Sequence, residues 1–181
     1  PAAVKEMQSA GIRVIIVTGD LAGTARAIAR EIGIIADPNE IINGIELDEM
    51  SDLELRQRLA TVKIISRVSP EGKYRLVEAF QAIGETVAMN GDGINDAPAL
   101  RAADIAVAMG TGTDVSKDVS DLVLLDDNFE TIVAAIKEGR RILDNIRKAI
   151  IYLTSTLLNE IFLIGGSLIM GVPVPLTALQ I

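Results

Sequence analysis

The chain has 181 residues, of which 49% are hydrophobic but only 3% aromatic, and its formal net charge at pH 7 is −8. Because the apolar content is aliphatic, as in buried strands and helices, an α/β fold is favoured over a disordered chain. The absence of cysteine and histidine excludes disulfides, thiolate zinc sites and catalysis by histidine, and the acidic balance argues against non-specific binding of nucleic acid.

Short apolar runs alternate with helical segments over the first 125 residues, an order typical of a parallel sheet covered by crossover helices. Helices are expected at residues 2–10, 21–32, 51–59 and 69–83, and strands at residues 13–17, 63–66, 86–89, 104–108 and 122–125. A loop is expected around residues 37–39 and 43–44. The pattern therefore predicts an open α/β domain at residues 1–128.

A further helix, capped by Asn128, is expected to begin near Phe129 and to meet no helix breaker before Gly165-Gly166. Its first part, residues 129–148, is charged and amphipathic, whereas residues 149–172 carry one charged side chain, Glu160. At about 1.5 Å per residue this apolar run spans roughly 36 Å, enough to cross a hydrocarbon core of about 30 Å. We therefore expect a helix that spans a lipid bilayer. The alternative is a long buried core helix.

Basic residues precede the apolar run and set its expected orientation. They are Arg140, Arg141, Arg147 and Lys148. By the positive-inside rule, residues 1–148 are expected in the cytoplasm.

The first chemical motif is Thr18-Gly19-Asp20, which directly follows an apolar strand. A hydroxyl and a backbone amide at the end of a strand and the start of a helix suit a phosphate oxygen. Such a tripeptide is, taken alone, more often a turn with a helix cap.

The second motif is Lys73, in the first turn of the helix expected at residues 69–83. A cation there opposes the helix dipole, which suggests that an anion compensates it. The alternative is a solvated surface lysine.

The third motif is Gly91-Asp92-Gly93-Ile94-Asn95-Asp96, again at the end of a strand. Its carboxylates are hard oxygen ligands suited to Mg²⁺, and its glycines let the backbone approach a phosphoryl group closely. A plain turn needs only one Asp and one Gly, so this motif favours function.

These motifs, in this order and with their flanks, resemble the P-type ATPases, which are built on the haloacid dehalogenase-like fold. The family's Thr-Gly-Asp lies at residues 18–20, its lysine is Lys73, and its hinge motif appears as NGDGINDAPAL, with Asn90 and Ile94 as departures. The segments DNFETIVAAIKEGR and ILDNIRKAIIYL resemble the branch that pumps calcium or exchanges sodium and potassium. The resemblance covers essentially the whole chain. It implies an incomplete Rossmann-like parallel sheet that continues into a long transmembrane helix.

The resemblance implies an ATP-driven cation pump, with calcium as the first candidate ion, in which an aspartate attacks the γ-phosphate of ATP. Asp92 would bind Mg²⁺ and Lys73 would hold a phosphoryl oxygen. Asp96 would orient Lys73 or the waters of the metal, and is a second candidate for the Mg²⁺ site.

The remaining polar groups of the motifs would bind the nucleotide. By the same resemblance Thr18 and Gly19 would bind another phosphoryl oxygen, Asn95 would donate to the phosphate, and Asp20 would support the site near the nucleotide.

The aspartate that such pumps phosphorylate lies in an Asp-Lys-Thr-Gly sequence, which does not occur here. The resemblance implies that it belongs to another part of the same protein, on a strand between those that end at Thr18 and Asp92. The actuator domain, the nucleotide-binding domain and further membrane segments would also be partners. The chain runs from Pro1 to Ile181, which lies inside an apolar stretch, so we expect a fragment. Because the strand with the phosphorylated aspartate would be missing from it, we expect the fragment to be inactive and unstable alone.

In this family the fifth membrane helix continues out of the phosphorylation domain and binds the transported ion. Glu160 aligns with such a ligand, and Asn159 is a second candidate. Alternatively, Glu160 pairs with a cation on a neighbouring helix. Leu157 and Asn159 stand where calcium pumps with two sites usually carry Asn and Gly, so the identity of the ion stays open.

The domain assignment that results is the later part of a phosphorylation domain at residues 1–128, a stalk helix at 129–148, a transmembrane helix at 149–172 and the start of a loop at 173–181. The protein is expected in a membrane that it crosses several times, the cell membrane first. Two rival interpretations are a soluble phosphatase of the same superfamily and a membrane-tethered module without catalysis. The apolar helix argues against the phosphatase.

Overall fold

The computed structural model of the protein describes residues 1–173, and the chain divides into two units. The first unit comprises Pro1–Val133, and the second begins at Ala134. The predicted loop at residues 173–181 lies outside the described residues apart from Pro173.

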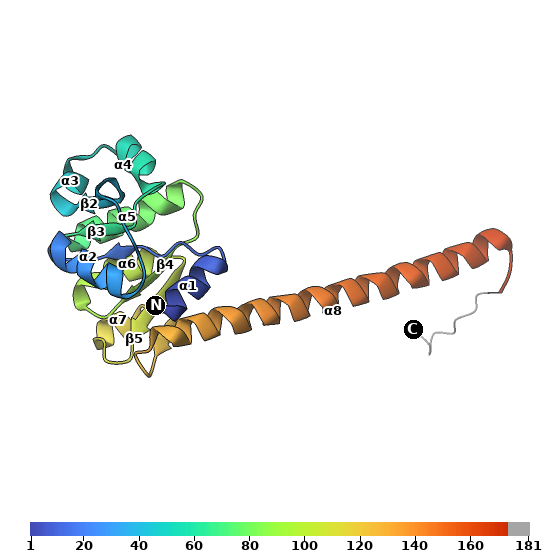
Figure 1. Ribbon diagram of the computed structural model, residues 1–181. Helices are drawn as coiled ribbons and strands as arrows, with labels where there is room; N and C mark the ends of the chain where they lie inside the picture. Colours follow the sequence, from blue (N-terminus) through green and yellow to red (C-terminus); the bar gives the residue numbers. More distant parts are fainter. Residues whose placement is uncertain (174–181) are drawn as a thin grey trace. The chain divides into compact units, whose positions relative to one another are not determined.

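All six strands of the described residues belong to the first unit, in two parallel sheets of three strands (Figure 1). They are β1 (Ile16–Val17), β2 (Ile41–Asn43), β3 (Ile64–Ser66), β4 (Ala88–Gly91), β5 (Ile105–Met109) and β6 (Leu122–Leu124). The first sheet has the order β1-β3-β2 and the second β4-β5-β6. In the first sheet Ile16 and Ile41 both lie in register with Ile64. The expected α/β architecture is therefore confirmed, with its strands divided between two sheets.

Helices connect and cover these strands. They are α1 (Ala2–Ser9), α2 (Ala22–Glu31), α3 (Gly44–Glu49), α4 (Asp52–Leu59), α5 (Pro70–Ala82), α6 (Ala97–Ala102), α7 (Asp114–Asp118) and α8 (Phe129–Met170), with short 3₁₀ turns at Pro38–Glu40 and Ile94–Asp96. Side chains that cap the first turn determine where several helices begin. The hydroxyl of Ser51 accepts from the amide of Glu54 at the start of α4, and that of Ser69 accepts from the amide of Gly72 at the start of α5. Both are the caps that free amides of a first turn require.

The prediction of a loop around residues 43–44 was wrong. The chain there forms β2 and then α3, with the side chain of Asn43 accepting from the amide of Ile45 as the helix cap. Gly44 is needed because a Cβ at this position would lie 1.9 Å from the carbonyl oxygen of Arg67. The Asn-Gly pair thus marks a close crossing of two backbones, although in sequence it is typical of a turn.

The first strand also differs from its prediction, a buried strand at residues 13–17. Only Ile16–Val17 pair with β3, and both residues are half-buried. By contrast β3, which has neighbours on both sides, is buried along its length. The difference follows from pairing, since β1 has a partner strand on one side only within residues 1–173.

The core of the first unit lies around the β1-β3-β2 sheet. One cluster is centred on Ile42, Leu55 and Ile65, and a second on Ala25, Ala29 and Ile64. Fully burying a leucine or isoleucine side chain contributes roughly 1.5–3 kcal/mol. The β1-β3-β2 sheet is therefore anchored by two apolar clusters.

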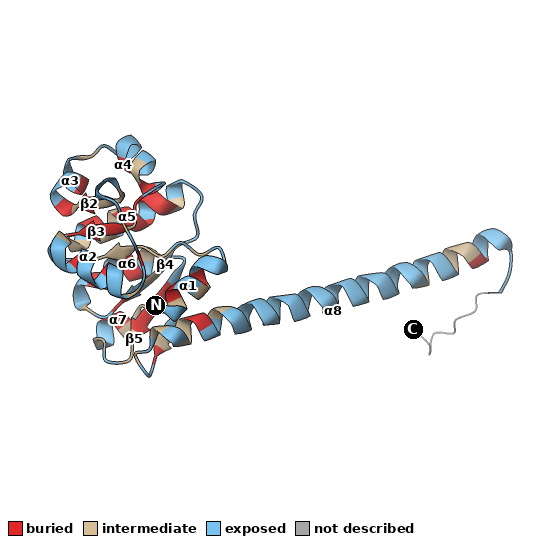
Figure 2. Ribbon diagram, viewed as in Figure 1, coloured by how far each residue is buried: buried red, intermediate tan, exposed pale blue. Residues whose placement is uncertain are grey.

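The second unit consists of the continuation of α8, which is a single helix of 42 residues. It does not end at Gly165-Gly166 but at Met170, followed by Gly171 with φ +68°. Among the described residues it is the one helix long and apolar enough to cross a membrane. Figure 2 shows its surface exposed over most of its length, as expected of a helix whose apolar side chains meet lipid or other helices.

Candidate functional site

The Thr18-Gly19-Asp20 motif lies at the carboxyl end of β1 and forms a closed turn. The amide of Asp20 donates to Oγ1 of Thr18 over 3.1 Å, and that hydroxyl donates to Oδ2 of Asp20 over 3.2 Å. The amide of Arg67, just beyond β3, donates to the carbonyl of Asp20 over 2.9 Å. The two strand ends are thus tied together. Gly19 and Asp20 remain exposed.

Lys73 is neither solvated nor left without an anion. Its Nζ lies 2.5 Å from Oδ1 of Asp96, and the two side chains are only 18% and 10% exposed. The other oxygen of Asp96 accepts from the amide of Gly93 over 3.3 Å. The anion that compensates a lysine in the first turn of α5 is therefore Asp96, the arrangement expected if Asp96 orients Lys73.

The turn after β4 brings the third motif to the same pair. A Cβ on Gly91 would lie 2.8 Å from the Cβ of Asp96, so glycine lets the aspartate fold back over the strand end. Asp92 and Asn95 are exposed. Within residues 1–173 neither of these two side chains has a hydrogen bond or ion pair, so both are available to a ligand.

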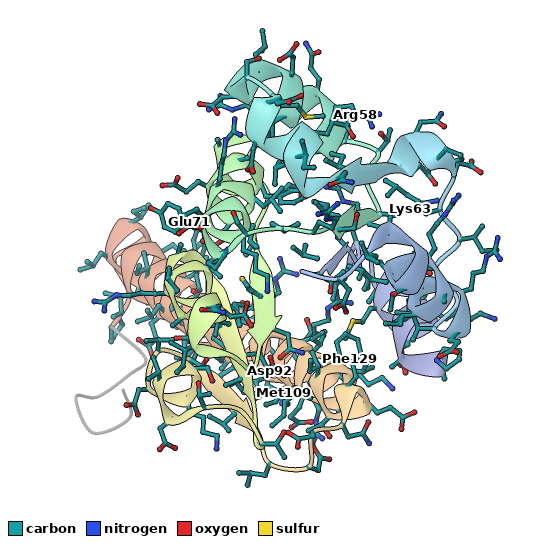
Figure 3. The ribbon with its side chains drawn as sticks, turned by 90° about the vertical axis from the view of Figure 1, so that its left-hand side faces the viewer. Arg58, Lys63, Glu71, Asp92, Met109 and Phe129 are labelled. Atoms are coloured by element: carbon teal, nitrogen blue, oxygen red, sulfur yellow. The ribbon has the colours of Figure 1, made fainter. Side chains whose placement is uncertain are left out.

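The turn after β5 and the start of α7, which were not expected to contribute, also reach this site. In residues 110–116, after β5, the amide of Thr113 donates to the carbonyl of Asp92 over 3.0 Å and Oγ of Ser116 donates to it over 3.2 Å. The carboxyl ends of β4 and β5 are adjacent, and Figure 3 shows Asp92 next to Met109, the last residue of β5. The sequence signal was GTGT directly after a strand, the kind of glycine pattern that marks a close backbone approach.

The motifs do not all meet within the described residues. Lys73, Asp96, Gly93 and the backbone of Asp92 form one connected group, whereas Thr18 has no hydrogen bond to any of them in residues 1–173. The described part of the chain contains no cluster of three or more carboxylates that could hold a metal. Mg²⁺ usually takes one or two protein carboxylates together with phosphate oxygens and water, so the free carboxylate of Asp92 fits one such ligand. Asp96 is engaged by Lys73.

The candidate ion ligands lie on α8 in the second unit. Asn159 is exposed and Glu160 partly buried. One helical turn earlier the hydroxyl of Thr156 donates to the carbonyl of Tyr152 over 3.0 Å.

The family model for haloacid dehalogenase-like hydrolases matches residues 1–104. The chain is 48% identical over 180 residues to a calcium-transporting ATPase of Bacillus subtilis, and 47% identical over 192 residues to the P-type sodium-transporting ATPase4 of Toxoplasma gondii. Each match covers 99% of this chain, but 20% of the first relative and 14% of the second.

Solved structures agree with these matches. A zinc-transporting PIB-type ATPase in an E2.Pi state superposes with a TM-score of 0.63 and 31% identity, covering 87% of this chain and 23% of that one. The chain therefore spans about one fifth of the length of the curated relatives it matches. From the family model, the relatives and the shared fold, the chain belongs to the haloacid dehalogenase-like hydrolases and, within them, to the P-type cation-transporting ATPases.

Proposed function

We propose that this chain is part of an ATP-driven pump that forms an aspartyl-phosphate intermediate and moves a cation, calcium first, across a membrane. The similarity to calcium-transporting relatives extends over 99% of the chain and so includes α8. That extent favours a pump over a soluble phosphatase of the same superfamily. The presence of Lys73, Asp92 and Asp96 favours a pump over a non-catalytic tether.

The observation that carries this proposal is that two strands lie at the edges of their sheets. β1 and β4, which end in the first and third motifs, are each an edge strand of a three-stranded sheet within residues 1–173. Both are partly exposed along their length. Parallel sheets are normally covered and their inner strands buried, so these edges suit one further strand that pairs with both. Such a strand would bring its own carboxyl end between Thr18 and Asp92.

We propose that this added strand, from another part of the pump, carries the phosphorylated aspartate. The carboxyl ends of parallel strands at a change of direction in the sheet are where α/β proteins place their ligands. A nucleophile on this strand would stand between the Thr18 turn and the Lys73–Asp96 pair, two groups that the described residues leave apart.

The roles of the side chains follow from this placement. Lys73, held by Asp96, donates to an oxygen of the transferring phosphoryl group, and Asp92 supplies a carboxylate ligand for Mg²⁺. When bound, Mg²⁺ would neutralise part of the charge on that group.

The remaining motif groups bind ATP and its phosphate. The hydroxyl of Thr18 and the amide of Gly19 bind a second phosphoryl oxygen, the amide of Asn95 donates to the phosphate, and Asp20 supports the nucleotide. With this assignment each strand end contributes donors or a carboxylate, and no histidine or cysteine is needed.

The membrane part of the proposal concerns α8. We propose that its apolar part crosses the cell membrane as one of several spans, with residues 1–148 on the cytoplasmic side, and that Glu160 and Asn159 bind the transported cation. A carboxylate within a membrane helix is costly and is commonly functional. The relatives include both calcium-transporting and sodium-transporting proteins. The transported ion is therefore to be identified by titrating the pump with different cations.

The test is phosphorylation of the full-length pump by radiolabelled ATP. Asp92→Ala and Lys73→Ala should each block formation of the acid-stable phosphoenzyme, since loss of one charge that stabilises the transition state costs about 2–4 kcal/mol of barrier. Glu31→Ala and Lys5→Ala, which remove exposed charges on α2 and α1, serve as controls and should phosphorylate normally. Normal phosphoenzyme levels in either site variant would refute the assigned role.

A further inference from the structure

The main chain of Asp92 is held by residues 110–116, the turn after β5 and the start of α7, called here the Asp92 seat. The carbonyl oxygen of Asp92 accepts from the amide of Thr113 over 3.0 Å, and Oγ of Ser116 lies 3.2 Å from the same oxygen. The single hydroxyl proton of Ser116 is shared between this carbonyl and that of Thr113, which is 2.8 Å away. The position of Asp92 is therefore set from the neighbouring strand end and not only by its own turn.

Ser116 is the fully buried member of the seat, with 0% of its surface exposed. Its Oγ lies 2.8 Å from the carbonyl oxygen of Thr113 and 3.1 Å from the hydroxyl of Thr113, in addition to the carbonyl of Asp92. A buried hydroxyl without partners would be unfavourable, and here every direction around the oxygen is occupied. The side chain is fixed at the junction between α7 and the turn that follows β4.

Gly112 shows how closely the seat fits against Asp92. A Cβ on Gly112 would lie 3.1 Å from the carbonyl oxygen of Asp92, 3.1 Å from Oγ of Ser116 and 2.9 Å from the carbonyl oxygen of Met109. Two of these three atoms are backbone oxygens, which cannot rotate away. One added methyl group would therefore force a shift against the carbonyl of Met109 and would also crowd the carbonyl of Asp92 and the hydroxyl of Ser116.

We propose that Ser116 is a positioning residue that holds Asp92 in place for Mg²⁺. The inference rests on the proposed function, in which Asp92 is the metal ligand. The carboxylate of Asp92 has no hydrogen-bond partner of its own in residues 1–173, so the backbone alone directs it. Mg²⁺ demands near-ideal octahedral geometry at short distances, and groups that orient a ligand without touching the metal commonly tune its affinity.

The experiment measures binding of Mn²⁺, used as a paramagnetic probe for the Mg²⁺ site, by electron paramagnetic resonance. The sample is the full-length pump with orthovanadate as a phosphoryl analogue. Ser116→Ala should weaken Mn²⁺ binding about tenfold, the lower end of the ~10–100-fold effects of residues that orient a metal ligand. Gly112→Ala, which keeps the hydroxyl and adds a methyl group beside the same carbonyl, should weaken binding to a similar degree.

Ser120→Ala is the matched control. Its hydroxyl donates to the carbonyl of Ser116 over 2.7 Å, so the substitution removes a hydrogen bond from the same segment without touching Asp92. It should leave Mn²⁺ affinity unchanged. Thermal unfolding midpoints of all variants are measured alongside, and if Ser116→Ala fails to fold, Gly112→Ala decides the question.

Asp92→Ala separates this inference from the function on which it rests. If Asp92→Ala abolishes Mn²⁺ binding while folded Ser116→Ala and Gly112→Ala bind as the parent does, the positioning role is refuted and the metal site stands. If Asp92→Ala itself binds Mn²⁺ normally, the proposed metal site fails. Equal weakening in Ser116→Ala and Ser120→Ala would also overturn the proposal, because it would show a general loosening of α7.

Discussion

Lys73 and Asp96 are each able to be largely buried because the other is present. Removal of one partner of such a pair leaves a charge without compensation, which is more harmful than removal of both. Lys73 also sits in the first turn of α5, where the helix dipole disfavours a cation. Asp96 therefore stabilises the lysine as well as directing it.

We expect Asp96→Ala to destabilise the protein by about 2 kcal/mol, below the ~3–5 kcal/mol of fully buried pairs because both side chains keep some exposure. Lys73→Met combined with Asp96→Ala should recover part of this loss, since no unpaired charge remains. The thermal unfolding midpoints of the two single variants and the double variant measure the effect. A double variant whose loss equals the sum of the two single losses would show that Lys73 and Asp96 do not stabilise each other.

Gly44 illustrates a constraint of a different kind, a backbone crossing with no room for a side chain. A Cβ there would lie 1.9 Å from the carbonyl oxygen of Arg67, and Arg67 itself has φ +54°. Gly44→Ala is expected to cost at least about 1–3 kcal/mol, the range for overpacking. Gly23→Ala is the matched control, because Gly23 lies in α2 with open space around its Cβ position; there alanine should stabilise by about 0.5–1 kcal/mol. Comparable thermal midpoints for the two variants would contradict the crossing.

At the scale of elements, two aspartates hold the entry into α8. Oδ2 of Asp126 accepts from the hydroxyl of Thr131 over 2.7 Å, and Oδ1 of Asp127 accepts from the amide of Thr111 over 3.1 Å. Asp127 has φ +50°, a conformation that Asp tolerates better than most residues. The first turn of α8 is therefore linked to the residues that form the Asp92 seat.

The same contacts predict a pH dependence. Hydrogen bonds from Thr111 hold the pKa of Asp127 below its usual range, and the hydroxyl of Thr131 does the same for the pKa of Asp126. A carboxylate whose pKa is lower in the folded protein stabilises it above the unfolded pKa, and this contribution is lost as the pH falls through the folded pKa.

Asp127→Asn should therefore lower the thermal unfolding midpoint at neutral pH, and the difference from the parent should shrink as the pH falls below about 4. Unfolding midpoints recorded between neutral and acidic pH test this. A difference that grows on acidification would have the wrong sign and would exclude the hydrogen-bonded carboxylate as its cause.

Elements with strong local signals were predicted well from the sequence. Ser69, Pro70 and the following apolar period gave α5 to within a residue of Pro70–Ala82, and Asn128 was the expected cap of α8, with Oδ1 accepting from the amide of Glu130 over 2.9 Å. β2 and α3 were missed because they are short and the need for Gly44 arises from Arg67, far away in sequence. The Asp92 seat was missed for the same reason. Its hydrogen bonds join residues more than 20 positions apart, which no local pattern shows.

The division into two sheets could not be predicted from the chain either. Residues 13–17 have the composition of a buried strand, yet burial depends on a neighbour that these residues do not specify. The resemblance indicated where a further strand would pair, and the exposed edges of β1 and β4 are compatible with it. The pairing itself remains a prediction, as do the roles of all the site residues: Thr18, Gly19, Asp20, Lys73, Asp92, Asn95 and Asp96.

For the whole molecule, the key prediction concerns Glu160. In the full-length pump Glu160→Gln should lower the apparent affinity for the cation that stimulates phosphorylation, because one charge of its site is lost, while phosphorylation at saturating cation stays normal. Titrations with calcium, sodium, potassium and protons identify the ion. Thr154→Val, a change on the same helix six positions away that removes a hydroxyl, serves as a control. An unchanged cation dependence in Glu160→Gln would reduce this residue to a structural one.

The unbroken length of α8 also has a mechanical consequence. Phe129, its first residue, packs against the core that contains Ile64, and 31 residues separate Phe129 from Glu160 along one helix. At about 1.5 Å per residue that distance is roughly 47 Å. In the proposed pump, a helix that moved as a rigid rod would act as a lever. A tilt of about 5° at Phe129 would move the level of Glu160 by about 4 Å, which is larger than the radius of an ion.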